Sequence, residues 1–150
     1  MLLGCMRLLS LLLLIGWIQV SFSQENVSWE ELADVEWTET YDTTTSISLL
    51  IADFGSNALK HKDSEIYISG YVIPLDALGI QFALSRTNYA SCFFCGQAGP
   101  ETVMDLLVSP RTIPVTKYNN TLLKFKGTLI LKEVNPNGFN YQLINAELVK

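Results

Sequence analysis

The chain has few of the residues that metal sites and nucleophilic enzymes need. Its 150 residues include one histidine, His61, and three cysteines, of which Cys5 lies in the N-terminal leader. One histidine gives no identifiable Ser-His-Asp set, and no second Cys pair is present to complete a four-ligand zinc site. A phosphate loop is also missing, because Gly96-x-x-Gly99 has no lysine after it. We therefore expect a non-enzymatic protein.

Basic residues are scarce as well. Ten Lys and Arg stand against fifteen Asp and Glu, and without Arg7 of the leader nine remain, which gives a net charge of −6. An acidic domain repels phosphate backbones, so general nucleic-acid binding is not expected. Aromatic residues are plentiful and no low-complexity tract occurs, which excludes a disordered chain.

The first residues read as a secretory signal peptide. Arg7 precedes an apolar run from Leu8 to Ile18, and small residues stand before a predicted cleavage after Ser23. The alternative is an uncleaved membrane anchor, since the run is nearly long enough to span a bilayer. Either Met1 or Met6 is the true start. Cleavage predicts a secreted or periplasmic protein with no transmembrane segment left.

The rest is the length of one domain, divided into an extension over 24–63 and a β-barrel domain over 64–150. In the extension, the Ser28 to Glu31 capping box predicts a short helix, and the alternation over 35–41 predicts a strand. Within the barrel domain, alternation and turn residues predict strands at 64–76, 79–87, 112–118, 122–134 and 139–150. Gly99-Pro100-Glu101 predicts the start of a helix between the second and third of these strands, with Val103, Leu106 and Leu107 facing inward.

Two of the long predicted strands contain a central glycine, Gly70 and Gly127. Glycine within a strand marks a bulge or a tight bend, as at the corner of a small barrel. The sequence therefore predicts a mainly β fold, an OB-like barrel of five to six antiparallel strands with one helix. The alternative is an α+β antiparallel sheet.

Three stretches resemble a family of secreted bacterial proteins known only as a domain of unknown function. They are the opening Ser28–Val35, the run Gly70-Tyr71-Val72-Ile73-Pro74-Leu75-Asp76 followed by Phe82–Ser85, and the Cys92–Cys95 loop with Pro100-Glu101. The resemblance covers roughly 28–148 and implies an OB-type barrel in a periplasmic protein or lipoprotein. Relatives often lie beside transport genes, which implies metal or envelope homeostasis. Many of them carry one Cys in a Pro-rich stretch in place of the C-x-x-C pair, so no ligand role carries over.

The C-x-x-C pair, Cys92 and Cys95, allows three interpretations. Outside the cytoplasm a lone pair of cysteines predicts a disulfide that clasps a tight turn. That bridge closes a very small loop and stabilises weakly, which also favours a reducible, redox-active bond. Alternatively the two thiolates bind zinc or another metal, with His61 and an acidic residue such as Glu101 or Asp105 completing the site. As a simpler alternative, His61 is a solvated loop residue between two lysines.

Two further groups have a plain structural interpretation. Trp29, Trp37 and Tyr41 are expected in the core rather than on a stacking surface. Lys124, Lys126 and Lys132 on one strand form only a modest basic patch. Together the patterns predict a binding or interaction module of the cell envelope for an unknown protein or small ligand, without a cofactor. The alternative is a thiol-disulfide or metal-handling protein that uses Cys92 and Cys95.

Overall fold

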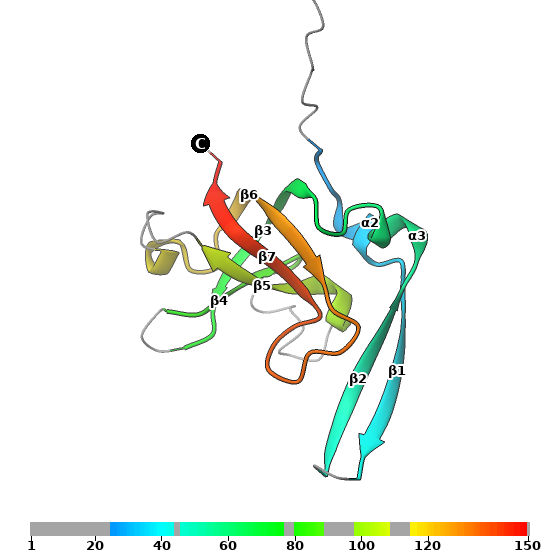
Figure 1. The fold of residues 1–150 in the computed structure, drawn as a ribbon. Helices are drawn as coiled ribbons and strands as arrows, with labels where there is room; N and C mark the ends of the chain where they lie inside the picture. Colours follow the sequence, from blue (N-terminus) through cyan, green and yellow to red (C-terminus); the bar gives the residue numbers. More distant parts are fainter. Residues whose placement is uncertain (1–24, 44–45, 77–79, 89–97, 109–114, 150) are drawn as a thin grey trace, which may run out of the picture.

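The fold is a β-barrel with a long two-stranded ribbon beside it (Figure 1). The computed structural model describes residues 25–43, 46–76, 80–88, 98–108 and 115–149. The ribbon consists of β1 (Val35–Asp42) and β2 (Ile47–Phe54), and the barrel strands are β3 (Glu65–Pro74), β4 (Phe82–Ser85), β5 (Val103–Val108), β6 (Leu122–Leu131) and β7 (Tyr141–Leu148). The helical turns are α2 (Trp29–Leu32), α3 (Ser56–Leu59), η4 (Pro100–Thr102) and η5 (Val115–Tyr118).

The five barrel strands close in the order β3-β4-β5-β7-β6. Three consecutive antiparallel strands, β3 to β5, are followed by β6, which returns to pair with β3; this is a Greek key. The last strand, β7, closes the barrel between β6 and β5 and runs parallel to β5. The predicted mainly β, OB-like barrel is therefore confirmed, and one parallel pair is added to the antiparallel pairs.

The helix predicted after Gly99 is a single turn, and the rest of that segment is a strand. Thr102 closes the turn, because both its backbone N–H and its hydroxyl donate to the Gly99 carbonyl. From Val103 the chain is extended, with Met104 and Leu106 buried in the core. The prediction of a helical inward face was wrong because six apolar-rich residues fit either period, and so short a run favours a strand.

Other predicted elements need smaller corrections. The predicted strand at 112–118 is wrong over its described part, because Val115–Tyr118 forms the 3₁₀ turn η5, while residues 112–114 lie outside the described residues. The predicted Ser28 capping box is confirmed: the Ser28 hydroxyl accepts from the Glu31 N–H at 3.3 Å, and Glu31 Oε2 accepts from the Ser28 N–H at 3.0 Å.

The two strand glycines serve different purposes. At Gly127 the pairing of β6 with β7 shifts register, which is the predicted bulge. At Gly70 the register with β6 is continuous, so the predicted bulge is wrong there. A Cβ on Gly70 would lie 2.7 Å from Leu84 Cγ and 2.9 Å from the Ser85 carbonyl oxygen. Glycine is therefore needed at Gly70 because β3 and β4 approach closely inside the barrel.

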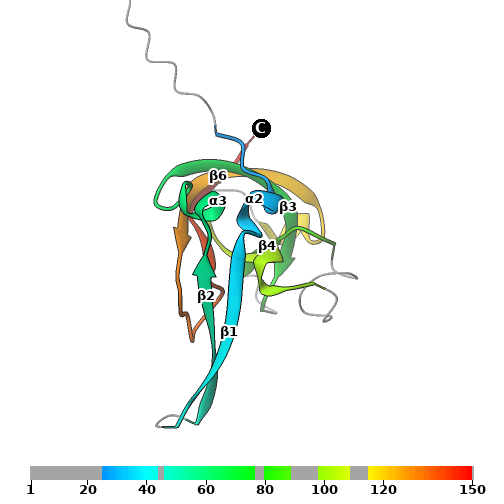
Figure 2. The same ribbon diagram turned by 90° about the vertical axis from the view of Figure 1, so that its right-hand side faces the viewer.

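One core joins the barrel to the extension. Side chains from all five barrel strands fill it, and α2 adds Trp29 and Leu32. The Trp29 indole N–H donates to the Ser69 carbonyl at 2.7 Å, which fixes α2 against β3. Ala52 and Phe54 bring the base of the ribbon into the same core. Beyond this base the ribbon projects away from the barrel, with α2 and α3 at its attached end (Figure 2).

Candidate binding groove

The sequence singled out Cys92, Cys95 and His61, and the structure describes only the last of them. Cys92 and Cys95 lie outside the described residues. His61 directly follows the turn after α3, and its side chain is 1% exposed. The interpretation of His61 as a solvated loop residue is therefore wrong. Its burial follows from the N-terminal segment, which pairs with β3 through Val27 and Tyr67 and lies over this corner of the barrel.

Two carboxylates flank the buried imidazole. Glu25 Oε1 lies 3.0 Å from His61 Nδ1, and Glu31 Oε1 lies 3.5 Å from Nε2. Neither contact has the geometry of a hydrogen bond. Both ring nitrogens of His61 therefore lack a hydrogen-bond partner among the described residues. Glu31 is engaged elsewhere, because the Lys60 ammonium donates to it at 2.6 Å. That hydrogen bond, together with the one from the Ser28 backbone, lowers the pKa of Glu31 to about 2.

The acidic residues considered as co-ligands of His61 contact other groups. Glu101 Oε2 accepts from the Trp37 indole N–H at 3.2 Å, and Asp105 accepts from Gln142 and the Phe139 backbone. Within the described part of the chain, no three His, Cys, Asp or Glu side chains are grouped so as to hold a metal ion.

The three aromatic residues of the extension do not form one cluster. Trp29 is buried, and Trp37 is half-buried with its ring 6.5 Å from the Tyr141 ring. Tyr41 lies near the far end of the ribbon and is 60% exposed, so its assignment to the core is wrong.

The lysines on the outer face of the barrel are engaged with neighbouring side chains. Lys126 lies between two carboxylates, 3.7 Å from Glu65 and 3.6 Å from Glu147, and both raise its pKa. Lys124 lies over the ring of Tyr67. These contacts leave little free positive charge on β6 for an anionic ligand.

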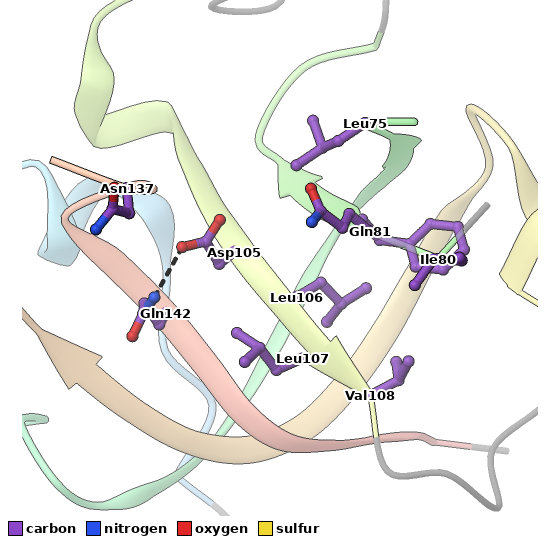
Figure 3. A pocket seen from close by; sticks show the side chains of 10 residues that line it. Leu75, Ile80, Gln81, Asp105, Leu106, Leu107, Val108, Asn137 and Gln142 are labelled. Atoms are coloured by element: carbon purple, nitrogen blue, oxygen red, sulfur yellow. Dashed lines mark hydrogen bonds between the residues drawn. The ribbon is translucent and has the colours of Figure 1, made fainter. Parts of the chain in front are cut away.

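A groove of about 370 Å³ lies on the outside of β5. Figure 3 shows Leu75, Ile80 and Gln81 on one side of it, Asn137 and Gln142 on the other, and β5 between them. Its lining residues come from the β3–β4 loop, β4, β5, the 132–140 loop between β6 and β7, and β7: Leu75, Ile80, Gln81, Phe82, Asp105, Leu106, Leu107, Val108, Asn137 and Gln142. In OB-type barrels, the face of strands two and three with these two loops is where ligands bind.

The groove presents exposed apolar side chains along one side and on β5. Ile80 is 72% exposed, Leu107 46% and Leu75 36%. Single exposed apolar residues need no explanation, but a set of them gathered around one hollow is typical of a binding surface.

Asp105 gives the groove one fixed charge. Its Oδ2 atom accepts hydrogen bonds from Gln142 Nε2 at 2.8 Å and from the Phe139 backbone N–H at 3.2 Å. Both of these hydrogen bonds go to Oδ2, and none within the described residues goes to Oδ1. Figure 3 shows the bond to Gln142. A half-buried carboxylate held in this way favours a hydrogen-bond donor or a cation.

The end of the run Gly70–Asp76 contributes Leu75 to the groove and shapes the loop that carries Ile80 and Gln81. The Asp76 carboxylate accepts hydrogen bonds from the backbone N–H groups of Ile80 and Gln81, and the Leu75 N–H donates to the Gln81 carbonyl at 2.9 Å. These bonds hold Leu75 and Ile80 at the edge of the hollow. Sequence reasoning marked this run as distinctive but did not connect it with a binding surface.

The closed Greek-key barrel, with its ribbon and its groove over β5, defines a small mainly β protein. No protein-family profile matches the sequence, and neither does any curated protein. Among solved structures, the chain is similar to a DUF3299 family protein from Pseudomonas aeruginosa PAO1, with a TM-score of 0.52 and 11% identity over 85% of this chain and 97% of that chain. At 11% identity, the comparison shows only that the two proteins share a fold.

Among the described residues, no helix combines the length and apolar character needed to span a bilayer.

Proposed function

We propose that this protein is a non-enzymatic binding module that works outside the cytoplasm and holds its ligand in the groove over β5. The observation that carries the proposal is the groove itself, in which exposed apolar side chains surround one oriented carboxylate. The fold shared with a DUF3299 family protein is consistent with membership in a bacterial family of unknown function. The leader-like N-terminus supports export.

The chemistry of the groove defines the ligand class. Leu75, Ile80 and Leu107 offer apolar contact, and Asp105 Oδ1 offers a charged acceptor. The ligand therefore combines a short apolar part with an ammonium or another strong hydrogen-bond donor. An oligonucleotide would bring phosphates toward Asp105 in a protein of net charge −5.

Simple amphiphiles can test the groove without knowledge of the natural ligand. We expect hexylamine to shift the backbone NMR signals of Ile80 and Leu107, hexanol to shift them less, and hexanoate not at all. Asp105→Asn should remove the preference of the amine over the alcohol, because the charge is lost while the shape is kept. Equal binding of hexanoate and hexylamine would exclude this ligand class.

A matched pair of variants tests the location. Leu107→Lys places a charge among the apolar groove residues and should abolish the amine-induced shifts. Leu122→Lys makes the same change at a 56% exposed leucine of β6 that does not line the groove, and should leave the shifts unchanged. Equal loss in both variants would show that the amine binds elsewhere.

A further inference from the structure

Among the described residues, the backbone contacts at the outer edge of β2 lie around Ile51 and Ala52. Near the barrel, Ile51 forms an antiparallel bridge with Val134, and the Ala52 N–H donates to the Glu133 carbonyl at 2.8 Å. These contacts show that this edge already pairs with extended backbone at one point.

The direction of the Ala52 N–H shows to which edge of the ribbon the backbone groups of the other β2 residues point. In an antiparallel ribbon the backbone groups of alternate residues point to the same edge. Since Ala52 points away from β1, Leu50 and Ser48 also turn their N–H and C=O groups to the outer edge. Their cross-strand partners, Glu39 and Tyr41, turn theirs to the opposite edge of the ribbon.

A second hollow lies along this open edge. It has a volume of about 260 Å³ and separates the ribbon from the 132–140 loop. We call it the notch; its lining residues are Ser48, Leu49, Leu50, Pro100, Val134, Asn135, Pro136, Gly138, Phe139 and Asn140. Several of these are apolar, and Val134 is 41% exposed. An extended chain placed here would meet backbone hydrogen-bonding groups on one side and apolar side chains around it.

The charge of the ribbon is one-sided. Residues 35–54 contain four Asp and Glu and no Lys or Arg. On the ribbon, Glu36, Glu39 and Asp53 are exposed, and Glu133 is exposed beside the notch. This acidity attracts a basic segment and repels a second copy of the same ribbon.

We propose that the notch receives an extended segment of a partner protein, which adds a third strand to the outer edge of β2. The backbone of the segment pairs with Ser48 and Leu50, its apolar side chains fill the notch, and its Lys or Arg side chains face the acidic ribbon. Strand addition of this kind draws affinity from main-chain hydrogen bonds and specificity from alternate side chains. A third strand also stabilises a ribbon that, as two strands, is marginal on its own.

A short capped peptide in which lysine and valine alternate is the first probe. Added to the full mature chain at low salt, it should slow amide exchange at Ser48 and Leu50 about tenfold or more. Binding should weaken as salt approaches 0.1 M and beyond, because charges farther apart than about 10 Å are then screened. The analogue of glutamate and valine should not bind.

Backbone pairing is tested separately from charge. A peptide with the same lysines but a central proline loses a main-chain donor, and its affinity should fall about tenfold or more. In the protein, Leu50→Pro removes an outward N–H without touching the bonds to β1 and should have the same effect. Tyr41→Pro removes an outward N–H at the opposite edge and should leave binding unchanged.

Three results would overturn the proposal. The first is tight binding by the proline peptide, which would indicate charge attraction alone. The second is protection of Glu39 and Tyr41 instead of Ser48 and Leu50. The third is protection of Ser48 and Leu50 in the absence of peptide that rises with protein concentration, which would assign the edge to a second copy of this chain. The peptide results do not depend on the variants, so they hold even if Leu50→Pro does not fold.

Discussion

The Tyr141 hydroxyl donates a hydrogen bond to the Leu32 carbonyl at 2.7 Å, and so joins β7 to α2 across 109 residues of sequence. Both residues are fully buried, and the rings of Trp37 and Phe54 meet the Tyr141 ring edge-on. This bond holds the end of α2 against the barrel core. It also gives a hydrogen-bond partner to the Leu32 carbonyl, which would otherwise be buried without one.

Tyr141→Phe tests that bond directly. The variant keeps the ring contacts but leaves the Leu32 carbonyl buried and unpaired, which should lower the free energy of unfolding by about 1–3 kcal/mol. Urea unfolding followed by tryptophan fluorescence measures the loss. Tyr41→Phe is the control, because that hydroxyl is on a 60% exposed side chain. A similar effect in both variants would contradict the structural role of the bond.

The same residue predicts a decline in stability at high pH. Burial raises the pKa of Tyr141 above its usual value, helped by Glu101 and Asp34. The folded state therefore holds the phenol proton more tightly than the unfolded state does, where the pKa is about 10. The contribution is fully present below pH ~10 and is lost as pH rises further. Tyr141→Phe should flatten the alkaline limb of the stability curve, and an unchanged limb would contradict the assignment.

Glu31 predicts an opposite effect in acid. Its pKa in the folded state is lowered to about 2, from its usual value of 4.5, mainly by Lys60 and the Ser28 backbone. Its contribution to stability is present above about pH 4.5 and is lost as pH falls toward 2. Glu31→Gln should reduce the acid dependence in this window. Glu30→Gln should not, since Glu30 carries a 68% exposed side chain with a single ion pair to Arg86.

The capping box of α2, formed by Ser28 and Glu31, is expected to contribute to the stability of the protein. Ser28→Ala removes the acceptor for the Glu31 N–H and should destabilise the protein by about 1 kcal/mol, measured by thermal or urea unfolding. A Ser28→Asp variant should recover most of the loss, because aspartate is an equally good N-cap. If aspartate does not recover it, the effect of alanine arises from something other than capping.

Gly70→Ala tests the close approach of β3 and β4. A Cβ there would press on Leu84 and on the Ser85 backbone, and relief requires a shift of the strand, so we expect a loss of about 1–3 kcal/mol. Ser69→Ala, at the exposed neighbouring position, should cost little, because Trp29 bonds to the Ser69 backbone carbonyl rather than to its side chain. Equal costs would show that the position tolerates a side chain.

Zinc titration separates the two sequence motifs that were considered for a metal. His61 is buried beside Glu25 and Glu31, and we expect His61→Gln to leave any zinc affinity unchanged. If the chain binds zinc, Cys92→Ser with Cys95→Ser should abolish it. Loss of zinc binding in His61→Gln, in a protein that remains folded, would restore His61 as a ligand.

Local patterns predicted much of the fold because their causes are local. The alternation over 35–41, 64–76 and 122–134 was enough to place three strands, and the Ser28 box gave a helix start. The segment 103–108 failed because Val103, Leu106 and Leu107 share the spacing of a helix face as well as lying in a strand. Only the ladder to β4 and β7, which is a tertiary feature, decides between the two.

The candidate site was harder to predict because its parts are distant in sequence. Asp105 obtains its role from Phe139 and Gln142, which follow it by 34 and 37 residues. The sequence between two lysines predicted a solvated His61, but His61 is buried, with Glu25 of the N-terminal segment and Glu31 of α2 beside its ring. A distinctive run such as Gly70–Asp76 was the available signal, since its aspartate shapes the loop beside the groove.

The 132–140 loop forms one wall of the groove through Asn137 and one wall of the notch through Pro136 and Gly138. It is anchored from the groove side by the bond between Asp105 and the Phe139 backbone, and a Cβ on Gly138 would lie 2.6 Å from the same carboxylate oxygen. Where an occupant of one hollow shifts this shared loop, it changes the affinity of the other hollow for its own occupant, and thermodynamics requires the change to be equal in both directions.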